Sequence, residues 1–277
     1  GVLDVAPEKK VSQTKTEDLL QRNDKTVANL RPKKPIFSSS GTSIYEVSKE
    51  LANQRADAAI IVSPGGTMAG IITDTDFTRR VVSRGIDPST TPVSEVMTPD
   101  PRSVGEDHPG IEAIATMIEN RFRHLPVIGR EENVIGVLDI ARCLNDAISK
   151  LERSVTREPN DTETLVKQAL QAAGGSDTEA LQALLKPLLS NALGSESGTR
   201  TLGSILSGVP RTIVAPNTSV FAAAAIMSEN RKAALVVEDG ELVGIFGFKD
   251  MMNRVVAKDV DSTCTAVADV MTADPEA

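Results

Sequence analysis

The chain has 277 residues, of which 40% are hydrophobic, enough to form one or two packed domains. Aromatic residues make up only 3% and tryptophan is absent, so any core must be built from aliphatic side chains. The formal net charge of -8 argues against nucleic acid or an anionic membrane surface as a partner.

Cysteine and histidine, the residues that most often bind zinc, are scarce. Two cysteines, Cys143 and Cys264, lie far apart in the sequence, and the two histidines are His108 and His124. We therefore expect no metal, and unpaired thiols suit a reducing compartment, which predicts a cytoplasmic protein. No membrane-spanning run, signal peptide, Walker-type loop or nucleophile–base motif is recognisable, so we expect neither a membrane protein nor an enzyme.

The first 97 residues contain a lead-in and one folded unit. Residues 1–25 are polar with little periodicity and are predicted to form a mobile N-terminal segment. From residue 26 to 97 the apolar pattern predicts the order β-α-β-β-α. The predicted elements are a leading strand at 34–37, a helix capped by Ser43 and Glu46, strands at 57–62 and 68–72 joined by a turn at 64–66, and a helix from Thr73 to about Arg84 that ends at Gly85.

The same order recurs twice. Residues 98–153 predict a leading strand at 102–104, a helix whose first residue is Pro109, strands at 125–128 and 134–138, and a helix from Asp139 to about Arg153. Residues 154–200 break the pattern and predict a helical linker with helices at 162–173 and 177–193. Residues 201–270 predict a leading strand at 211–214, a helix at 219–229, a hairpin of 234–237 and 242–246 around Asp239-Gly240, and a helix at 248–258.

The recurrence indicates duplication. Aligning Gly70–Pro101 with Gly244–Pro275, a shift of 174 positions without a gap, gives 14 identities in 32, which duplication explains better than chance. Val-Met-Thr-x-Asp-Pro precedes the second unit at Val96 and recurs at Val270. Residues 271–277 are therefore interpreted as the start of a truncated fourth unit.

The stretch Gly70-Ile71-Ile72-Thr73-Asp74-Thr75-Asp76 is the leading candidate for a binding site. It predicts a strand that runs into a helix N-terminus, where free N–H groups and the helix dipole favour an anion. Thr73 offers a hydroxyl, and the Asp76 carboxylate can accept two hydrogen bonds from a ribose diol. A capping box, with Thr73 as N-cap and Asp76 three residues later, is the alternative interpretation.

These features together resemble CBS-domain proteins. The matching marks are Val-Met-Thr before a unit, the β-α-β-β-α order, Arg-His-Leu-Pro-Val at 123–127 and Gly-Ile-Ile-Thr-x-x-Asp at 70–76. The resemblance covers roughly residues 26–153 and 201–277. More narrowly, residues 122–127 and 138–149 are similar to plant and fungal proteins with four CBS motifs, which also carry a Phox/Bem-type interaction domain.

The resemblance implies an α/β fold in which CBS motifs one (26–97) and two (98–153) pack through their sheets into a Bateman module, followed by the linker and CBS motif three. We call these the first, second and third motifs. Family members often bind adenosine nucleotides in clefts between motifs, and their modules commonly pair, so AMP, ADP or ATP is the expected ligand and a homodimer the expected assembly.

Carried over from the family, one cleft has a full set of candidate residues. Asp76 would hold the ribose hydroxyls, with Thr73 and Thr75 near ribose and phosphate. Ser103 and Val104 would flank the adenine, and Arg123 and His124 would meet the phosphates. Each also has a plainer interpretation: strand residues for Ser103 and Val104, a solvated charge for Arg123, and a packed histidine for His124.

The other clefts depart from the family pattern. In the second motif, Asp139 replaces the threonine and Arg142 replaces the ribose aspartate, and a guanidinium cannot accept hydrogen bonds. Asp139 is then best explained as a helix cap. In the third motif Asp250 is kept as a possible second site, although Gly247 replaces the threonine.

Two functions follow from these observations. The first is a non-catalytic regulatory module that senses energy state by binding an adenosine nucleotide and transmits this to a partner or attached domain. The second is a structural module for dimerisation or protein interaction that binds no ligand. The intact set Thr73, Asp76 and Arg123 favours the first, and the substitutions at Asp139, Arg142 and Gly247 favour the second.

Overall fold

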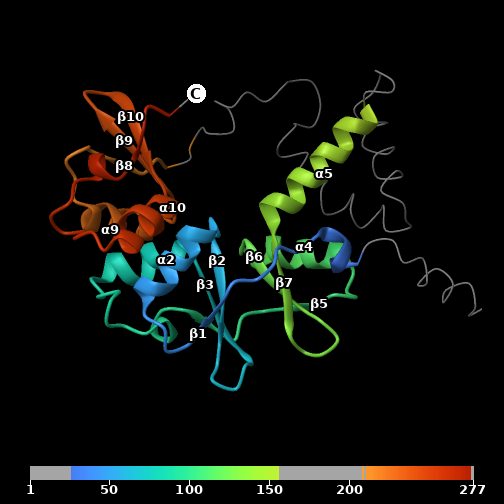
Figure 1. Cartoon of the computed structure of the whole chain (residues 1–277). Coiled ribbons are helices and arrows are strands. Elements are labelled where there is room, and N and C mark those ends of the chain that lie inside the picture. Colours follow the sequence, from blue (N-terminus) through green and yellow to red (C-terminus); the bar gives the residue numbers. More distant parts are fainter. Residues whose placement is uncertain (1–25, 156–207, 209, 276–277) are drawn as a thin grey trace, which may run out of the picture. The chain divides into compact units, whose positions relative to one another are not determined.

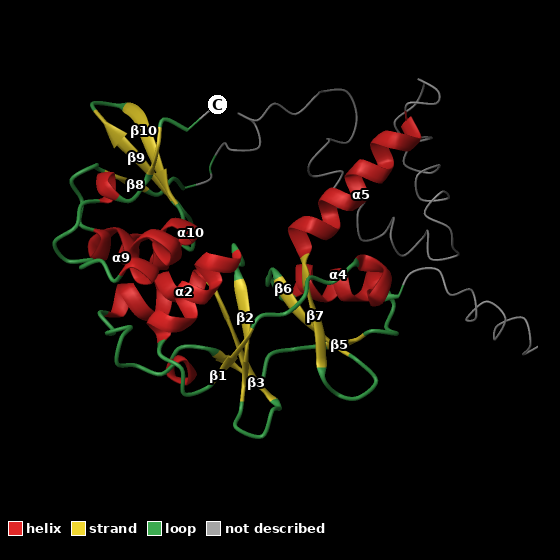
Figure 2. Cartoon of the chain, viewed as in Figure 1, coloured by secondary structure: helices red, strands yellow, loops and turns green. Residues whose placement is uncertain are grey.

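The computed structural model describes residues 26–155, 208 and 210–275 (Figures 1 and 2). The lead-in over 1–25 and the linker helices at 162–173 and 177–193 lie outside the described residues. The chain divides into two compact units, each taken by itself below. The first consists of the described parts of Gly1–Pro32, Glu106–Arg123 and Asp139–Thr199, and the second of those of Lys33–Gly105, His124–Leu138 and Arg200–Ala277.

The first unit holds the helices of the second motif. α4 spans Gly110–Glu119, α5 spans Ile140–Val155, and a 3-10 turn, η1, spans Val27–Leu30. Pro109 is the N-cap of α4 and not its first helical residue as predicted, because its ψ of 125° is not helical. Pro109 forms an isolated antiparallel bridge with Thr26, and this pairing holds it outside the helix.

The second unit contains the first motif from Lys33 onward, with the predicted order of elements. β1 (Phe37–Ser39) lies parallel to β2 (Ala58–Val62), which is antiparallel to β3 (Met68–Thr73), and β4 (Thr98–Pro99) closes the sheet on the far side of β3. α2 (Ile44–Gln54) begins with the predicted capping box, in which Ser43 Oγ accepts a hydrogen bond from the Glu46 N–H at 3.2 Å.

The helix after β3 differs from the prediction in its type. It consists of one α-helical turn, α3 (Asp74–Asp76), five π-helical residues, η2 (Phe77–Val81), and a 3-10 turn, η3 (Val82–Arg84). Gly85 ends it at a φ of 64°, as predicted. Residues 77, 78, 81 and 82 are all buried, so one face of this segment packs into the core.

The third motif, also in the second unit, repeats this architecture. β8 (Ile213–Val214), β9 (Ala234–Glu238), β10 (Glu241–Phe246) and β11 (Thr272–Ala273) form a sheet of order β11-β10-β9-β8, and α9 spans Val220–Asn230. α10 (Phe248–Asp250), η5 (Met251–Val255) and η6 (Val256–Lys258) reproduce the α, π and 3-10 sequence. Asp239 and Gly240, with φ of 48° and 86°, form the predicted hairpin turn.

The first and third motifs share one core within the second unit. α2 contacts η5 and η6, and reciprocally α9 contacts η2 and η3, so the helical faces of the two motifs lie side by side (Figure 1). This reciprocity is that of a self-complementary dimer interface, here formed inside one chain. The fully buried side chains at its centre include Ile44, Leu51, Phe77, Met227 and Met251.

The other face of the first sheet meets a strand of the second motif. β5 (Val104–Gly105), β6 (His124–Ile128) and β7 (Val134–Asp139) form a three-stranded sheet. Val137 of β7 packs with Ile60 and Ile71 of the first sheet in a small apolar cluster. The first motif is thus covered on both sides.

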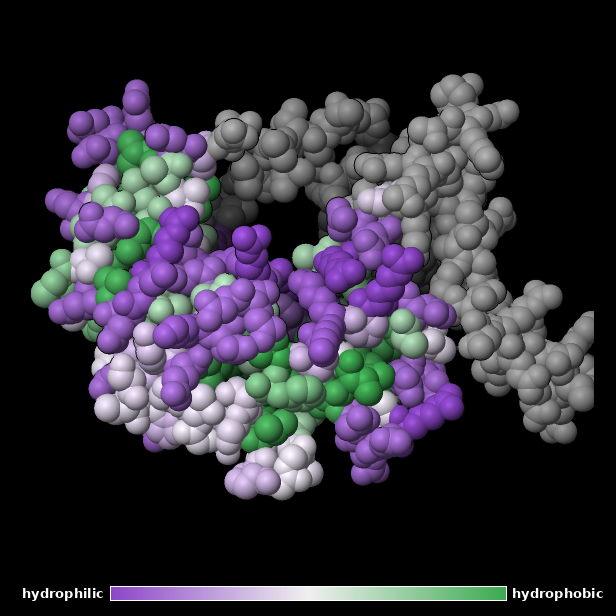
Figure 3. Space-filling view, viewed as in Figure 1, coloured by the Kyte–Doolittle hydropathy of each residue, from purple (hydrophilic) through white to green (hydrophobic). Residues whose placement is uncertain are grey.

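In the sheet of the third motif, strands β8 and β10 expose apolar side chains. Ile213 and Leu242 are about half exposed, and hydrophobic atoms are visible over these strands at the upper left of the space-filling view (Figure 3). Over the residues that the structure describes, no helix is both long and apolar enough to cross a bilayer.

Gly70 and Gly244, at matching positions of β3 and β10, offer a test of the packing. A Cβ at Gly70 would lie 2.8 Å from the main-chain oxygen of Thr98, whereas at Gly244 the close atoms belong to the flexible side chain of Met271. We expect Gly70→Ala to lower the free energy of unfolding by about 1–3 kcal/mol, because β4 must move. Gly244→Ala should cost less, and urea unfolding of both variants measures the difference; equal losses would contradict this account.

Candidate functional site

The end of β3 builds a compact turn around Asp76. Asp76 Oδ2 accepts hydrogen bonds from the Thr73 N–H and from Thr73 Oγ1, each at 2.9 Å. Arg80 Nε lies 3.4 Å from Asp76 Oδ1, one helical turn further on. Asp76 is only 8% exposed, so its carboxylate is held in one orientation by these partners.

The capping interpretation of Thr73 and Asp76 is therefore confirmed, and it does not exclude ligand binding. A carboxylate offers about four lone-pair sites. The two Thr73 donors approach Oδ2, while Arg80 approaches Oδ1 at the longer distance. The Asp76 carboxylate therefore retains lone pairs that can accept hydrogen bonds from two hydroxyl groups.

Burial raises the pKa of the Asp76 carboxyl above its ordinary value of 3.8, against the lowering effects of Arg80 and of the Thr73 hydrogen bonds. The low dielectric of the site penalises the charged form. The folded protein consequently holds this proton more tightly than the unfolded chain does.

This shift predicts a pH dependence of stability. Between pH 3.8 and the raised pKa, the folded state binds more protons than the unfolded state, so the contribution of Asp76 to the free energy of unfolding falls as pH rises. Asp76→Asn removes this contribution. We expect wild type to lose stability relative to Asp76→Asn as pH rises through that window, measured by urea unfolding at several pH values. If the stability of wild type minus that of Asp76→Asn stayed constant or rose with pH, the raised pKa of Asp76 would be contradicted.

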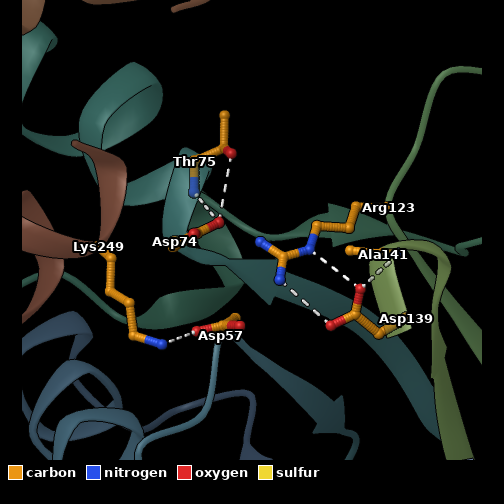
Figure 4. Close-up of polar contacts among 7 residues, drawn as sticks. All are labelled: Asp57, Asp74, Thr75, Arg123, Asp139, Ala141 and Lys249. Atoms are coloured by element: carbon orange, nitrogen blue, oxygen red, sulfur yellow. Dashed lines mark hydrogen bonds and ion pairs between the residues drawn. The ribbon is translucent and has the colours of Figure 1, made fainter. Parts of the chain in front are cut away.

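Asp74 and Thr75 form a second small network in the same turn. Asp74 Oδ1 accepts from the Thr75 N–H at 2.8 Å and from Thr75 Oγ1 at 3.3 Å (Figure 4). The Asp74 N–H donates to the main-chain oxygen of Asp57 at 2.9 Å, which ties the turn to the start of β2. The sequence analysis gave neither Asp74 nor Asp57 a role in the site. The available signals were the position of Asp74 beside Thr73 and that of Asp57 at the start of a buried strand.

A residue from the third motif reaches the same end of the first sheet. Lys249 Nζ lies 2.7 Å from Asp57 Oδ1 (Figure 4). The Asp57 side chain is 10% exposed and that of Lys249 is 52% exposed. No sequence signal pointed to this ion pair, because its members are 192 positions apart.

Ser103 and Val104 lie at the start of the second motif's sheet. Val104 pairs with Val127 in the parallel β5–β6 ladder and is half-buried, while Ser103 is exposed. His124 begins β6 and is half-buried. The structure places these three residues in the second unit with Thr73, Thr75 and Asp76.

Arg123 belongs to the first unit, where it binds a carboxylate. Its Nε and Nη2 lie 3.1 and 3.2 Å from the two oxygens of Asp139, a bidentate arrangement (Figure 4). Asp139 is buried, and its Oδ1 also accepts from the Ala141 N–H at 3.1 Å at the start of α5. The helix-cap role predicted for Asp139 is confirmed, whereas the phosphate role of Arg123 remains a prediction.

The third motif holds Asp250 in the same kind of turn without a threonine. Asp250 Oδ2 accepts from the Gly247 N–H at 2.9 Å, and Arg254 Nη1 lies 3.4 Å from Oδ1. Thr272 Oγ1 also donates to Oδ1 at 3.3 Å. Asp250 thus keeps the carboxylate geometry of Asp76 but lacks the Thr73 hydroxyl.

Comparison with known proteins gives consistent results. A family model described as the CBS domain matches residues 93–148 and 207–257. CBS domain-containing protein CBSCBSPB1 of Arabidopsis thaliana is 33% identical over 259 residues, which cover 93% of this chain and 46% of that protein. Meiotically up-regulated gene 70 protein of Schizosaccharomyces pombe is 25% identical over 252 residues, which cover 84% of this chain and 34% of that protein.

Among solved structures, protein MJ1225 from Methanocaldococcus jannaschii aligns with a TM-score of 0.59 at 15% identity, covering 90% of this chain and 82% of that one. At this identity the likeness shows a common fold and nothing further. The chain spans about half the length of the Arabidopsis relative.

Proposed function

We propose that this chain, whose residues 93–148 and 207–257 match the CBS-domain model, is a non-catalytic regulatory module that binds an adenosine nucleotide at the Asp76 turn. The observation that carries the proposal is the Asp76 carboxylate: buried, fixed by Thr73, and with acceptor capacity remaining. In this proposal Asp76 accepts the hydrogen bonds of the ribose diol.

The remaining site residues extend this proposal. Thr73 and Thr75 would contact ribose and phosphate, Ser103 and Val104 the adenine, and Arg123 and His124 the phosphates. Asp250 is proposed as a second, weaker site, because it has the same carboxylate geometry without the threonine hydroxyl. Adenosine nucleotides fit this chemistry because they combine a diol, an apolar base and an anion.

Binding would act by shifting an equilibrium between arrangements of the motifs, by as much as the nucleotide's affinity differs between them. We propose that an attached domain or partner, such as the Phox/Bem-type domain suggested by the resemblance, responds to this shift as a sensor of energy state. We also propose that two chains pair into a homodimer. A cytoplasmic location belongs to the same proposal and is supported by the free thiols of Cys143 and Cys264.

A ligand-free interaction module is the second candidate. The observation favouring it is the bidentate contact of Arg123 with Asp139, which engages a guanidinium that the family pattern directs to phosphate. This candidate predicts that no nucleotide changes the stability of the chain.

A thermal-unfolding screen separates the two candidates. The chain is heated with AMP, ADP, ATP, adenosine or S-adenosylmethionine, with GTP as the control for non-specific phosphate binding. A ligand present at 100 times its dissociation constant adds about 2.7 kcal/mol of stability, which raises the midpoint by several degrees. A shift with an adenosine compound but not with GTP supports the sensor. No shift with any compound, in a chain that unfolds cooperatively, leaves the interaction module.

A further inference from the structure

Lys249 extends from one motif to the binding turn of another. It lies in α10 of the third motif, yet its ammonium contacts Asp57 Oδ1, at the start of β2 in the first motif, at 2.7 Å (Figure 4). The main-chain oxygen of the same Asp57 accepts the N–H of Asp74, the first residue of α3. The short helices α10 and α3 themselves contact one another. The ammonium is therefore linked to the Asp76 turn through a single residue.

Three carboxylates give this end of the first sheet a negative charge. Asp57, Asp74 and Asp76 all have side chains that are largely shielded from water. Arg80 balances the charge of Asp76 in part, but a phosphate placed beside Asp57 and Asp74 would still be repelled unless a further positive group stood near it. Lys249 is half exposed, and its ammonium has three N–H donors, of which one is directed at Asp57.

The first motif has no basic residue at the position that corresponds to Lys249. In the alignment of Gly70–Pro101 with Gly244–Pro275, the counterpart of Lys249 is Thr75. Thr75 donates to the neighbouring Asp74 and carries no charge. The Lys249 contact is thus an asymmetric addition to an otherwise reciprocal interface between the motifs.

We propose that Lys249 forms a phosphate subsite for the ligand of the Asp76 turn, so that the binding site spans the first and third motifs. This inference rests on the proposed nucleotide function. The 5′-phosphate of a nucleoside monophosphate is attached to the same sugar whose diol Asp76 would hold, so it lies near this turn. When the phosphate binds, it shares the ammonium with Asp57, and the ligand's phosphate group thereby contacts both motifs.

The test compares AMP with adenosine, which differs only by the phosphate. Both ligands are titrated calorimetrically into wild type, Lys249→Met and Lys258→Met, the last being an exposed lysine of the same motif. We expect Lys249→Met to weaken AMP binding about tenfold, the value of one charge-assisted hydrogen bond, and to change adenosine binding less than about twofold. Lys258→Met should alter neither affinity.

A second variant should change the AMP affinity in the opposite direction. Asp57→Asn removes the carboxylate that shares the ammonium, so AMP should bind more tightly than to wild type. AMP affinity unchanged in Lys249→Met, or AMP and adenosine weakened equally, would overturn the subsite while leaving the nucleotide function intact. Failure of wild type to bind either compound would instead overturn the proposed function and the subsite together. Thermal unfolding without ligand establishes that each variant is folded.

Discussion

Asp76→Ala is expected to weaken AMP binding by at least about a hundredfold. The substitution removes the acceptor proposed for both ribose hydroxyls, and hydrogen bonds to a charged group contribute roughly 1.5–3 kcal/mol each. Isothermal titration calorimetry of wild type and variant measures the loss. The alanine variant also lacks the partner of the Thr73 hydrogen bonds, so its folding must be examined separately.

Asp250→Ala is the matched comparison, because Asp250 occupies the corresponding turn of the third motif with a similar set of hydrogen bonds. Asp250 is itself proposed as a weaker site and adjoins Lys249, so its loss should remove the weaker binding event and lower the affinity of the Asp76 site far less than Asp76→Ala does. Equal losses in the two variants, or an unchanged affinity in Asp76→Ala, would contradict the assignment of the ribose to Asp76.

Asp76→Ala should change the free energy of unfolding only modestly. Losing the acceptor for the Thr73 N–H and hydroxyl costs about 0.5–2 kcal/mol, as for other helix caps. Removing a buried carboxylate whose pKa is raised by burial acts in the opposite direction. These effects offset one another in part, so lost binding in a variant that still unfolds cooperatively can be attributed to the site.

Phe77→Ala is expected to have the largest effect on folding. Phe77 is fully buried in the core shared by the first and third motifs and begins the π-helical turn after Asp76. Truncating such a side chain costs about 3–5 kcal/mol, because the cavity left behind collapses only partly. Urea unfolding monitored by circular dichroism measures the loss.

Phe37→Ala serves as the control for this prediction, because Phe37 is 51% exposed. Its substitution should change the free energy of unfolding by less than about 1 kcal/mol. If the two phenylalanine variants were equally stable, the first and third motifs would not share the core described above, and the reciprocal packing of their helices would be wrong.

The order of strands and helices could be predicted because its signals are local and occur three times. The capping box at Ser43 and the hairpin at Asp239-Gly240 depend on residues no more than three positions apart, and both are present. The π-helical turn at Phe77–Val81 was missed because its apolar residues have the spacing of an ordinary α-helix, so the sequence pattern does not distinguish the two helix types.

Contacts between distant residues could not be predicted from local patterns. The Thr73–Asp76 turn was recognised, since both members lie within four positions. The partners of Arg123 and Lys249 were not, because Asp139 and Asp57 are 16 and 192 positions away. In both cases the sequence shows a basic residue, and the fold alone determines which carboxylate it meets.

A crystal structure of the chain with AMP would show directly whether the Asp76 turn binds the nucleotide. We expect the ribose diol within hydrogen-bond distance of Asp76 and the phosphate beside Lys249. Nucleotide bound elsewhere, with the Asp76 turn empty at a saturating concentration of AMP, would contradict the proposed site.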